Sequence, residues 1–186
     1  MKHILIILSL NILILSCSEN TAILSSEQLT YVNGKMYLKY DMSLATGTSK
    51  NWYSNGQLSS EANFKNGEFD GLVKTWYENG QFKEEFNYKD GQFHGLTKSW
   101  HSNGQLKDVV QFKNGKKDGY ARYWYENGQM QYDQYFLLGK EDGLFKEWYE
   151  NGQLRKKVEF KNGKIKDGLV QIWGERGQLL EIQRNF

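Results

Sequence analysis

The sequence is poor in the side chains on which most catalytic chemistry depends. It has 186 residues, with one cysteine, three histidines and no proline. A single cysteine cannot form a disulfide within the chain. So few histidines and thiols leave almost no candidates for a nucleophile and its general base. We therefore expect that the protein is not an enzyme and that it carries no cofactor.

An excess of charge of one sign is also missing. The 24 lysines and arginines are balanced by 22 aspartates and glutamates, which leaves a formal net charge of +2, and acids and bases alternate along the chain. Proteins that bind nucleic acid usually carry a basic block or stripe, so the sequence does not support that function. The aromatic content of 15% is high and excludes a simply disordered chain.

One motif dominates the rest of the chain. Trp-Tyr-Glu-Asn-Gly-Gln, or a close variant of it, recurs every 24 residues and begins at Trp52, Trp76, Trp100, Trp124 and Trp148. A degraded sixth copy begins at Trp173, so all six tryptophans occupy this one position. A fixed period of this size indicates an array of supersecondary units rather than a chain folded around one catalytic centre.

Each repeat contains two turn signals and therefore two strands. The first signal is the Asn-Gly of the motif, such as Asn79-Gly80, and the second follows eleven residues later, as at Asp90-Gly91. Asn, Asp and Gly accept a positive φ at low cost, so these dipeptides between apolar runs predict β-hairpins. We expect an all-β fold: an elongated, single-layer antiparallel β-meander of about six hairpin repeats of 24 residues.

The alternation of side chains along a strand predicts how each hairpin pairs. A three-residue loop ending in a glycine bulge would place Trp76 opposite Phe82 and Lys74 opposite Glu84. A two-residue loop would pair Trp76 with Lys83 and mix apolar with polar side chains, so the longer loop is favoured. By the same rule, Lys98 would face Asp108, Lys146 would face Lys156 and Arg122 would face Tyr132.

This pairing predicts two unlike faces. One would carry the tryptophans together with leucines and phenylalanines, with a row of cations through it at Lys50, Lys74, Lys98, Arg122 and Lys146. Cations without an acid opposite are expected over neighbouring tryptophan rings or in solvent. The other face would carry an aromatic row at Tyr53, Tyr77, His101, Tyr125 and Tyr149. This row is our candidate surface for binding a partner; alternatively, it only packs along the sheet.

The N-terminus has a different character. A short positive start is followed by an apolar run from Ile4 to Leu15, which is too short to span a bilayer and fits a signal peptide. The run ends at Ser16, directly before Cys17, and this arrangement resembles the lipobox of bacterial lipoproteins. The resemblance implies a signal peptide at 1–16, lipidation of Cys17 and a polar tether at 17–28. The alternative is an ordinary signal peptide with an incidental cysteine.

The few remaining catalytic or metal-binding candidates have simpler explanations. His94 occupies the position of an aspartate in the second turn and His101 replaces a tyrosine, so both are consistent with drift between repeats. Acids recur beside a glycine at Asp70, Asp118, Asp142 and Asp167, where an Asx-type turn hydrogen bond is the expected role. A calcium array would need more carboxylates per turn, and no glycine loop has the spacing of a phosphate site. We expect no metal site.

The repeat resembles the MORN repeat, and in particular its bacterial MORN-2 variant. The resemblance rests on Trp-Tyr-x-Asn-Gly-Gln-Leu followed by Phe-Lys-Asn-Gly-Lys-x-Asp-Gly, and it covers nearly all of the domain that we expect at 29–186. It implies a meander of successive hairpins, in agreement with the pairing above. Chains of this type are often labelled YwqK-family antitoxins, which implies neutralising a toxin by direct binding in the cytoplasm. A lipobox departs from that expectation.

Three functions therefore stand as hypotheses. The first is a lipid-anchored interaction module in the bacterial cell envelope that presents its sheet to a protein or envelope partner. The second is an antitoxin or immunity-type protein that binds a toxin. The third is a scaffold that binds lipid headgroups through the row of cations, although a near-neutral net charge argues against strong membrane attraction.

Overall fold

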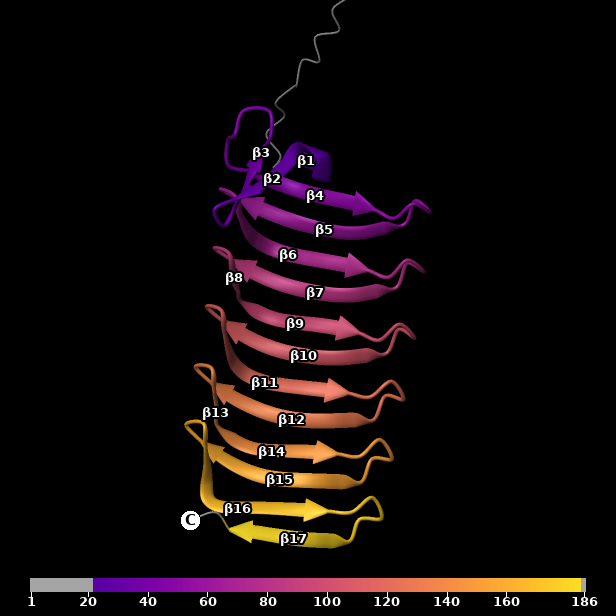
Figure 1. Ribbon diagram of the computed structural model, residues 1–186, viewed down its shortest axis with the longest axis vertical. Coiled ribbons are helices and arrows are strands. Elements are labelled where there is room, and N and C mark those ends of the chain that lie inside the picture. The colour runs from indigo at the N-terminus through magenta and orange to yellow at the C-terminus, as the bar shows by residue number, and fades with distance from the viewer. Residues whose placement is uncertain (1–21, 185–186) are drawn as a thin grey trace, which may run out of the picture.

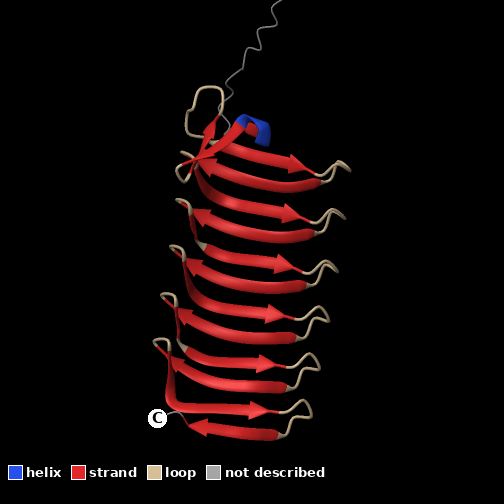
Figure 2. Cartoon of the chain, in the orientation of Figure 1, coloured by secondary structure: helices blue, strands red, loops and turns tan. Residues whose placement is uncertain are grey.

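The chain forms one long, open sheet whose strands lie across its long axis (Figure 1). The computed structural model describes residues 22–184. Nearly all of this part is strand, turn or short loop (Figure 2). The predicted all-β, single-layer antiparallel meander is therefore confirmed. The predicted signal peptide at 1–16 and the predicted lipidation site at Cys17 lie outside the described residues.

Strands follow each other in the sheet almost in chain order. The elements are β1 (Ile23–Ser25), η1 (Ser26–Gln28, a 3-10 turn), β2 (Leu29–Val32), β3 (Lys35–Leu38), β4 (Gly47–Trp52), β5 (Leu58–Lys65), β6 (Glu68–Trp76), β7 (Phe82–Lys89), β8 (Gln92–Phe93), β9 (Gly95–Trp100), β10 (Leu106–Lys113), β11 (Lys116–Trp124), β12 (Met130–Leu137), β13 (Lys140–Glu141), β14 (Gly143–Trp148), β15 (Leu154–Lys161), β16 (Lys164–Trp173) and β17 (Leu179–Arg184). The order in the sheet is β1-β4-β5-β6-β7-β9-β10-β11-β12-β14-β15-β16-β17, with β8 beside β7 and β13 beside β12. No helix in the described part of the chain is long and apolar enough to cross a membrane.

The loop of the Trp motif has the predicted three residues. We number the hairpins from β4–β5, so that β6–β7 is the second and β11–β12 the fourth. In the second hairpin the backbone N–H of Tyr77 donates to the carbonyl of Gln81 at 2.8 Å, and the N–H of Gly80 donates to the carbonyl of Tyr77 at 2.9 Å. Gly80 has a φ of +84°, which explains the glycine at this place. Such a loop is a tight turn followed by a glycine bulge. The same bonds recur at the corresponding loops of the other hairpins.

The second turn is tighter, with only two residues. Lys65 pairs with Glu68, and both residues between them have positive φ, +51° at Asn66 and +77° at Gly67. A two-residue turn with both φ values positive matches the twist of the flanking strands and selects Asn-Gly or Asp-Gly. Leu138 holds the same position in the fourth hairpin at φ +52°. A leucine there is strained, because its Cβ crowds the backbone.

A bulge that the sequence did not predict changes the register beside every Trp motif. Trp76 pairs with Phe82 as predicted, but Thr75 pairs with Glu84, so Lys83 is an extra residue on its strand. Beyond the bulge the pairing moves by one residue. The predicted opposition of Lys74 to Glu84 is therefore wrong. The observed opposite residues are Glu85 for Lys74, Val109 for Lys98, Asp133 for Arg122 and Lys157 for Lys146.

The shift also corrects the predicted faces. The tryptophans share their face with the row of cations and with the leucines at the repeat position of Leu72, such as Leu96 and Leu144. We call this side the tryptophan face. Most of the phenylalanines lie on the other face. Val73 pairs with Phe86 on the other side, which we call the phenylalanine face. By alternation along the strand, Tyr77 lies on the phenylalanine face as well. The aromatic row was thus correctly separated from the tryptophans but wrongly assigned to a face without apolar columns.

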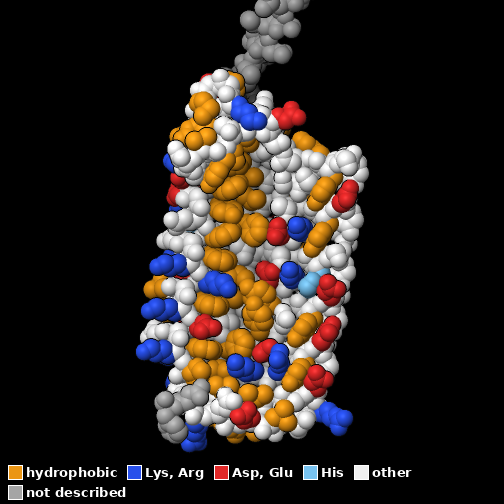
Figure 3. Space-filling model, in the orientation of Figure 1, with side chains coloured by type: hydrophobic (Ala, Val, Ile, Leu, Met, Phe, Trp, Pro, Cys, Tyr) orange, Lys and Arg blue, Asp and Glu red, His pale blue; other side chains and the backbone are white. Residues whose placement is uncertain are grey.

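The phenylalanine face holds the best-buried side chains. A central column of small or medium residues crosses the sheet, and its buried members are Ser49, Thr97, Val110, Ala121, Gln134, Val158 and Val170. Beside it runs a chain of ring contacts, with centroids 5.0 Å apart for Phe69 and Tyr88 and 4.6 Å apart for Tyr88 and Phe93. Burial raises the pKa of the Tyr88 phenol. A continuous hydrophobic band down the sheet is visible in Figure 3. Each aromatic contact contributes about 0.5–1.5 kcal/mol beyond its buried area.

Three of the five cations in the row on the tryptophan face, Lys50, Lys98 and Arg122, are paired with acids from neighbouring strands. Lys50 binds Glu61 at 3.0 Å, and Arg122 binds Asp133 at 3.1 Å. For Arg122, this pair replaces the position over a tryptophan ring or in solvent that we expected. Such half-exposed pairs are worth about 0–1 kcal/mol each, so they specify register more than they add stability.

The N-terminal end is built differently from the repeats. β1 lies parallel to β4, and Leu24 packs with Leu29, Ala45 and Phe64 in the one cluster of buried apolar residues found in the described chain. The hairpin β2–β3 forms a separate two-stranded sheet above it. The segment expected as a tether at 17–28 is thus structured from residue 23, because its apolar Leu24 covers the end of the sheet.

We predict that Leu138→Asn stabilises the protein by about 1 kcal/mol, because asparagine adopts positive φ more readily than leucine. The reverse change at an equivalent turn, Asn114→Leu, should cost a similar amount. Urea unfolding followed by circular dichroism measures both. Equal midpoints for Leu138→Asn and the parent chain would contradict the assignment of strain to this turn.

Candidate functional site

The five side chains predicted to bind a partner do form one column. Each of them directly follows the last residue of a strand, on the side of the sheet where the longer loops lie (Figure 1). They are Tyr53, Tyr77, His101, Tyr125 and Tyr149. All five are partly exposed. One ring in each of two repeats also has a cation beside it, with Lys83 Nζ 6.0 Å from the centre of Tyr77 and the Arg155 guanidinium 5.5 Å from that of Tyr149.

Each member of this column is hydrogen-bonded to the next repeat. The phenol of Tyr53 donates to the carbonyl of Trp76 at 2.7 Å, and Tyr77 donates to Trp100 at 2.8 Å. The series continues with Tyr125 to Trp148 at 2.9 Å and Tyr149 to Trp173 at 3.0 Å. These side chains therefore hold adjacent loops together. Contact with a partner through the remaining ring surface stays a prediction.

Other residues of the Trp motif serve the same junction. The Asn55 side-chain amide donates to the carbonyl of Glu78 at 3.0 Å, while its oxygen accepts from the Gln57 backbone at 2.9 Å. The same bond to the next loop forms at Asn103, Asn127 and Asn151. In the second hairpin Asn79 instead reaches Gln81 in its own loop. Stacking of loops thus explains most of the motif.

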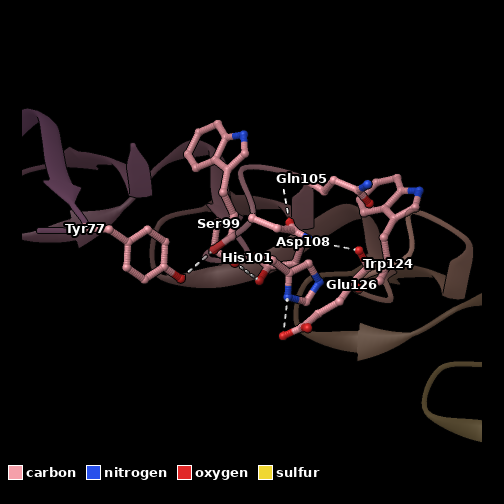
Figure 4. A network of polar contacts seen from close by, with 9 residues as sticks. Tyr77, Ser99, His101, Gln105, Asp108, Trp124 and Glu126 are labelled. Carbon is pink, nitrogen blue, oxygen red and sulfur yellow. Dashed lines mark hydrogen bonds and ion pairs between the residues drawn. The ribbon is translucent and has the colours of Figure 1, made fainter. Parts of the chain in front are cut away.

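His101 is the one departure in the column. Its Nε2 lies 2.9 Å from the Trp124 carbonyl, and its Nδ1 lies 3.9 Å from a Glu126 carboxylate oxygen (Figure 4). Donation to the carbonyl requires the tautomer with hydrogen on Nε2. In Figure 4, His101 and Glu126 point to the opposite side of the loop from Trp124. The histidine therefore reproduces the junction that tyrosine makes elsewhere.

The acids of the second turns also connect repeats. Asp118 accepts a hydrogen bond from the backbone N–H of Leu138 at 3.1 Å, and Asp142 accepts one from Asn162 at 3.3 Å. Lys161 and this backbone N–H lower the pKa of Asp142. We expected such acids to bond within their own turn, and the bond instead goes to the turn twenty residues later. No group of three or more His, Cys, Asp or Glu among residues 22–184 has the geometry to hold a metal ion.

His94 shows what the aspartate provides. It occupies the same place as Asp118 but makes no bond to the next turn, and its Nδ1 is buried without a partner in the described structure. An unpaired buried nitrogen is costly, so the histidine weakens this junction.

Two hollows were not predicted from the sequence. The hairpin β2–β3 overhangs the phenylalanine face and leaves an apolar groove of about 410 Å³, lined by residues such as Leu29, Tyr31 and Phe69. A second hollow of about 560 Å³ is lined by Tyr120, Tyr135 and polar neighbours on β12 and β14. The second hollow forms because Tyr120 and Tyr135 lie opposite each other on one face. That pairing follows from the bulge, which the sequence did not predict.

Comparison with known families agrees with the repeat geometry. Five segments match the model described as a MORN repeat variant: 45–66, 69–90, 93–114, 117–137 and 141–162. Each matched segment covers one hairpin with its Trp motif, and β16 and β17 form a sixth hairpin beyond them. No curated protein matches the sequence at a significant level.

Removing one phenol at the junction should loosen two adjacent repeats. Tyr125→Phe deletes the bond to Trp148 and should cost about 1 kcal/mol in the free energy of unfolding. Tyr120→Phe is the matched control, because the Tyr120 hydroxyl makes no hydrogen bond to the described residues and the side chain is 50% exposed. Urea titration of both variants gives the comparison. If both shift equally, the junction bond contributes nothing specific.

Proposed function

Because the chain belongs to the family of MORN repeat variants, we propose that it is a lipid-anchored interaction module of the bacterial cell envelope. Its extended sheet would bind a protein or another envelope component, and a lipid on Cys17 would hold it at the membrane. Repeat arrays of this kind offer long surfaces for binding. The finding of the family supports a repeat-based binding module, and the anchor and the partner are our inference.

One observation carries the proposal: both faces of the sheet are left open. From β9 to β17, no second layer covers either face within the described residues. Large apolar side chains stay exposed as a result, including Leu96 at 44% and Tyr120 at 50%. Exposed apolar side chains in quantity are typical of proteins that bind other molecules.

The inferred anchor suits this shape. Cys17 is the sole cysteine, and it stands directly after the apolar run. Four residues separate Cys17 from Ala22, so the five chain steps between them span at most roughly 18 Å. The N-terminal end of the sheet would then lie nearest the membrane, and the six hairpins would present their faces to partners in the envelope.

The alternatives rest on less. An antitoxin that binds a toxin would use the same open faces, and it would fit an exported chain if the toxin acts in the envelope. A lipid-headgroup scaffold would need free cations, whereas several of the cations in the row are paired with acids, as Arg122 is with Asp133. The lipid hypothesis is therefore the weakest of the three.

We predict that the mature protein begins at a lipid-modified Cys17. Mass spectrometry of the protein from its native membranes should show a diacyl or triacyl mass on an N-terminal Cys17 peptide. Cys17→Ala should move the protein from the membrane to the soluble fraction, while Ser16→Ala should not. Recovery of the unmodified residue, or an unchanged membrane fraction in Cys17→Ala, would rule out the anchor.

Partner binding can be separated from the junction role of the tyrosines. Changing Tyr77, Tyr125 and Tyr149 together to Phe removes the phenol bonds but keeps the rings, and changing them to Ser removes both. We expect the Phe variant to be cross-linked to an envelope partner, as the parent chain is. The Ser variant should lose this cross-link. Circular dichroism must show an intact sheet in both. Capture that is equal in all three chains would reject the column as the contact surface.

A further inference from the structure

The fourth hairpin differs from its neighbours on the tryptophan face. Tyr120 stands where the second and third hairpins have Leu72 and Leu96. Opposite it, Tyr135 stands where the first two have asparagine, as at Asn87. The two rings are 5.1 Å apart at 75°. The corresponding pairs are Leu72 with Asn87, Leu96 with Gln111 and Leu144 with Glu159, so among these hairpins only the fourth has two aromatic residues here.

The fourth hairpin lacks a contact that the first two hairpins make. The Asn63 side chain donates to the Leu72 carbonyl at 2.8 Å, and Asn87 donates to Leu96 at 2.7 Å. A tyrosine side chain has no amide to make this bond. The same hairpin also carries the strained Leu138. Positions that break local rules without a structural gain are where function is expected.

The aromatic pair forms one wall of a hollow. Tyr120, Tyr135, Asp133, Asp142, Leu144 and Lys146 line this space of about 560 Å³. The Arg122 guanidinium lies 4.5 Å from the centre of the Tyr120 ring and covers one of its faces. Beyond Leu144 the hollow adjoins a smaller one of about 140 Å³, which Lys157 and Gln171 help to line. The two hollows share Leu144, and we call them together the groove; their lining residues come from strands between β11 and β16.

The charges in this groove are mixed and include two lysines, Lys146 and Lys157, opposite each other, with Asp133 on the other side of Lys146. Arg122 is bound to Asp133 at 3.1 Å, and Asp142 is bound to Lys161 at 3.2 Å. Lys146 and Lys157 are direct cross-strand neighbours, and neither ammonium lies within 4.0 Å of a carboxylate in the described part of the chain. Like charges opposite each other are unfavourable until an anion joins them.

We propose that this groove binds a saccharide that carries a carboxylate. The aromatic walls would stack on the apolar face of a sugar ring, the phenols and carboxylates would bond its hydroxyls, and the lysine pair would hold its acid group. Sites for small ligands combine aromatic walls with a few placed polar groups in this way. The inference rests on the proposed function, because it takes the sheet to be a binding surface.

Other polymers fit the groove less well. A peptide that binds an extended sheet normally pairs with an edge strand, whereas the groove crosses strands whose backbone groups are already paired on both sides. A nucleic acid or an anionic membrane would require an unbroken run of cations. The carboxylates of Asp133 and Asp142 interrupt that run.

The test uses the full chain purified in detergent and four probes. These are a hyaluronate tetrasaccharide as acidic saccharide, chitotetraose as neutral saccharide, a hexaglutamate peptide, and vesicles of anionic phospholipid. Calorimetry or tryptophan fluorescence measures the affinity. The double variant Tyr120→Leu with Tyr135→Asn restores the residues of the second hairpin and should not lower stability. Lys146→Gln removes one cation, and Lys74→Gln is its control in the second hairpin.

We expect the acidic tetrasaccharide to bind more tightly than chitotetraose. The double variant should weaken it about tenfold, as should Lys146→Gln, while Lys74→Gln should not. Preferred binding of hexaglutamate or of vesicles, or no loss in the double variant, would overturn the proposal. Failure here, with capture through the tyrosine column retained, would remove this site and leave the interaction module standing.

Discussion

The hydrogen bond from a loop tyrosine to the tryptophan carbonyl 23 residues later, or 24 at the last junction, is the contact on which the rest of the array depends. A single-layer sheet has no second layer against which to bury a core, so each hairpin can be held only by its two neighbours. Net, one such bond is worth about 0.5–1.5 kcal/mol. Its larger effect is on register, because a slip by one residue would break it and move every side chain to the opposite face.

Several features of the fold could be predicted from the sequence because they are local. The period of the tryptophans gave the number of hairpins, and Asn79-Gly80 gave a three-residue loop through the φ preference of glycine. The bulge at Lys83 was not predictable in the same way. Alternation along one strand says which residues share a side, but it cannot reveal an extra residue on the partner strand. One such residue, Lys83, places Lys74 opposite Glu85 instead of Glu84.

The candidate site shows the same division. The row from Tyr53 to Tyr149 could be located by counting, and it does form a column. Its bonds to the next repeat could not be foreseen, because they join residues that only the stacking of loops brings together. The groove beside Tyr135 was harder still. Single substitutions such as Tyr135 for asparagine resemble drift until the pairing shows that Tyr120 lies opposite.

The strands lie across the long axis, and their backbone hydrogen bonds therefore point along it (Figure 2). A pull on the far end of the molecule would load those bonds along their own direction and open them a few at a time, from β17 inward. Such a sheet yields in steps, hairpin by hairpin, instead of giving way all at once. If its first strand is held at a surface, the molecule would lengthen in steps, one hairpin at a time, as the tension on its far end rises.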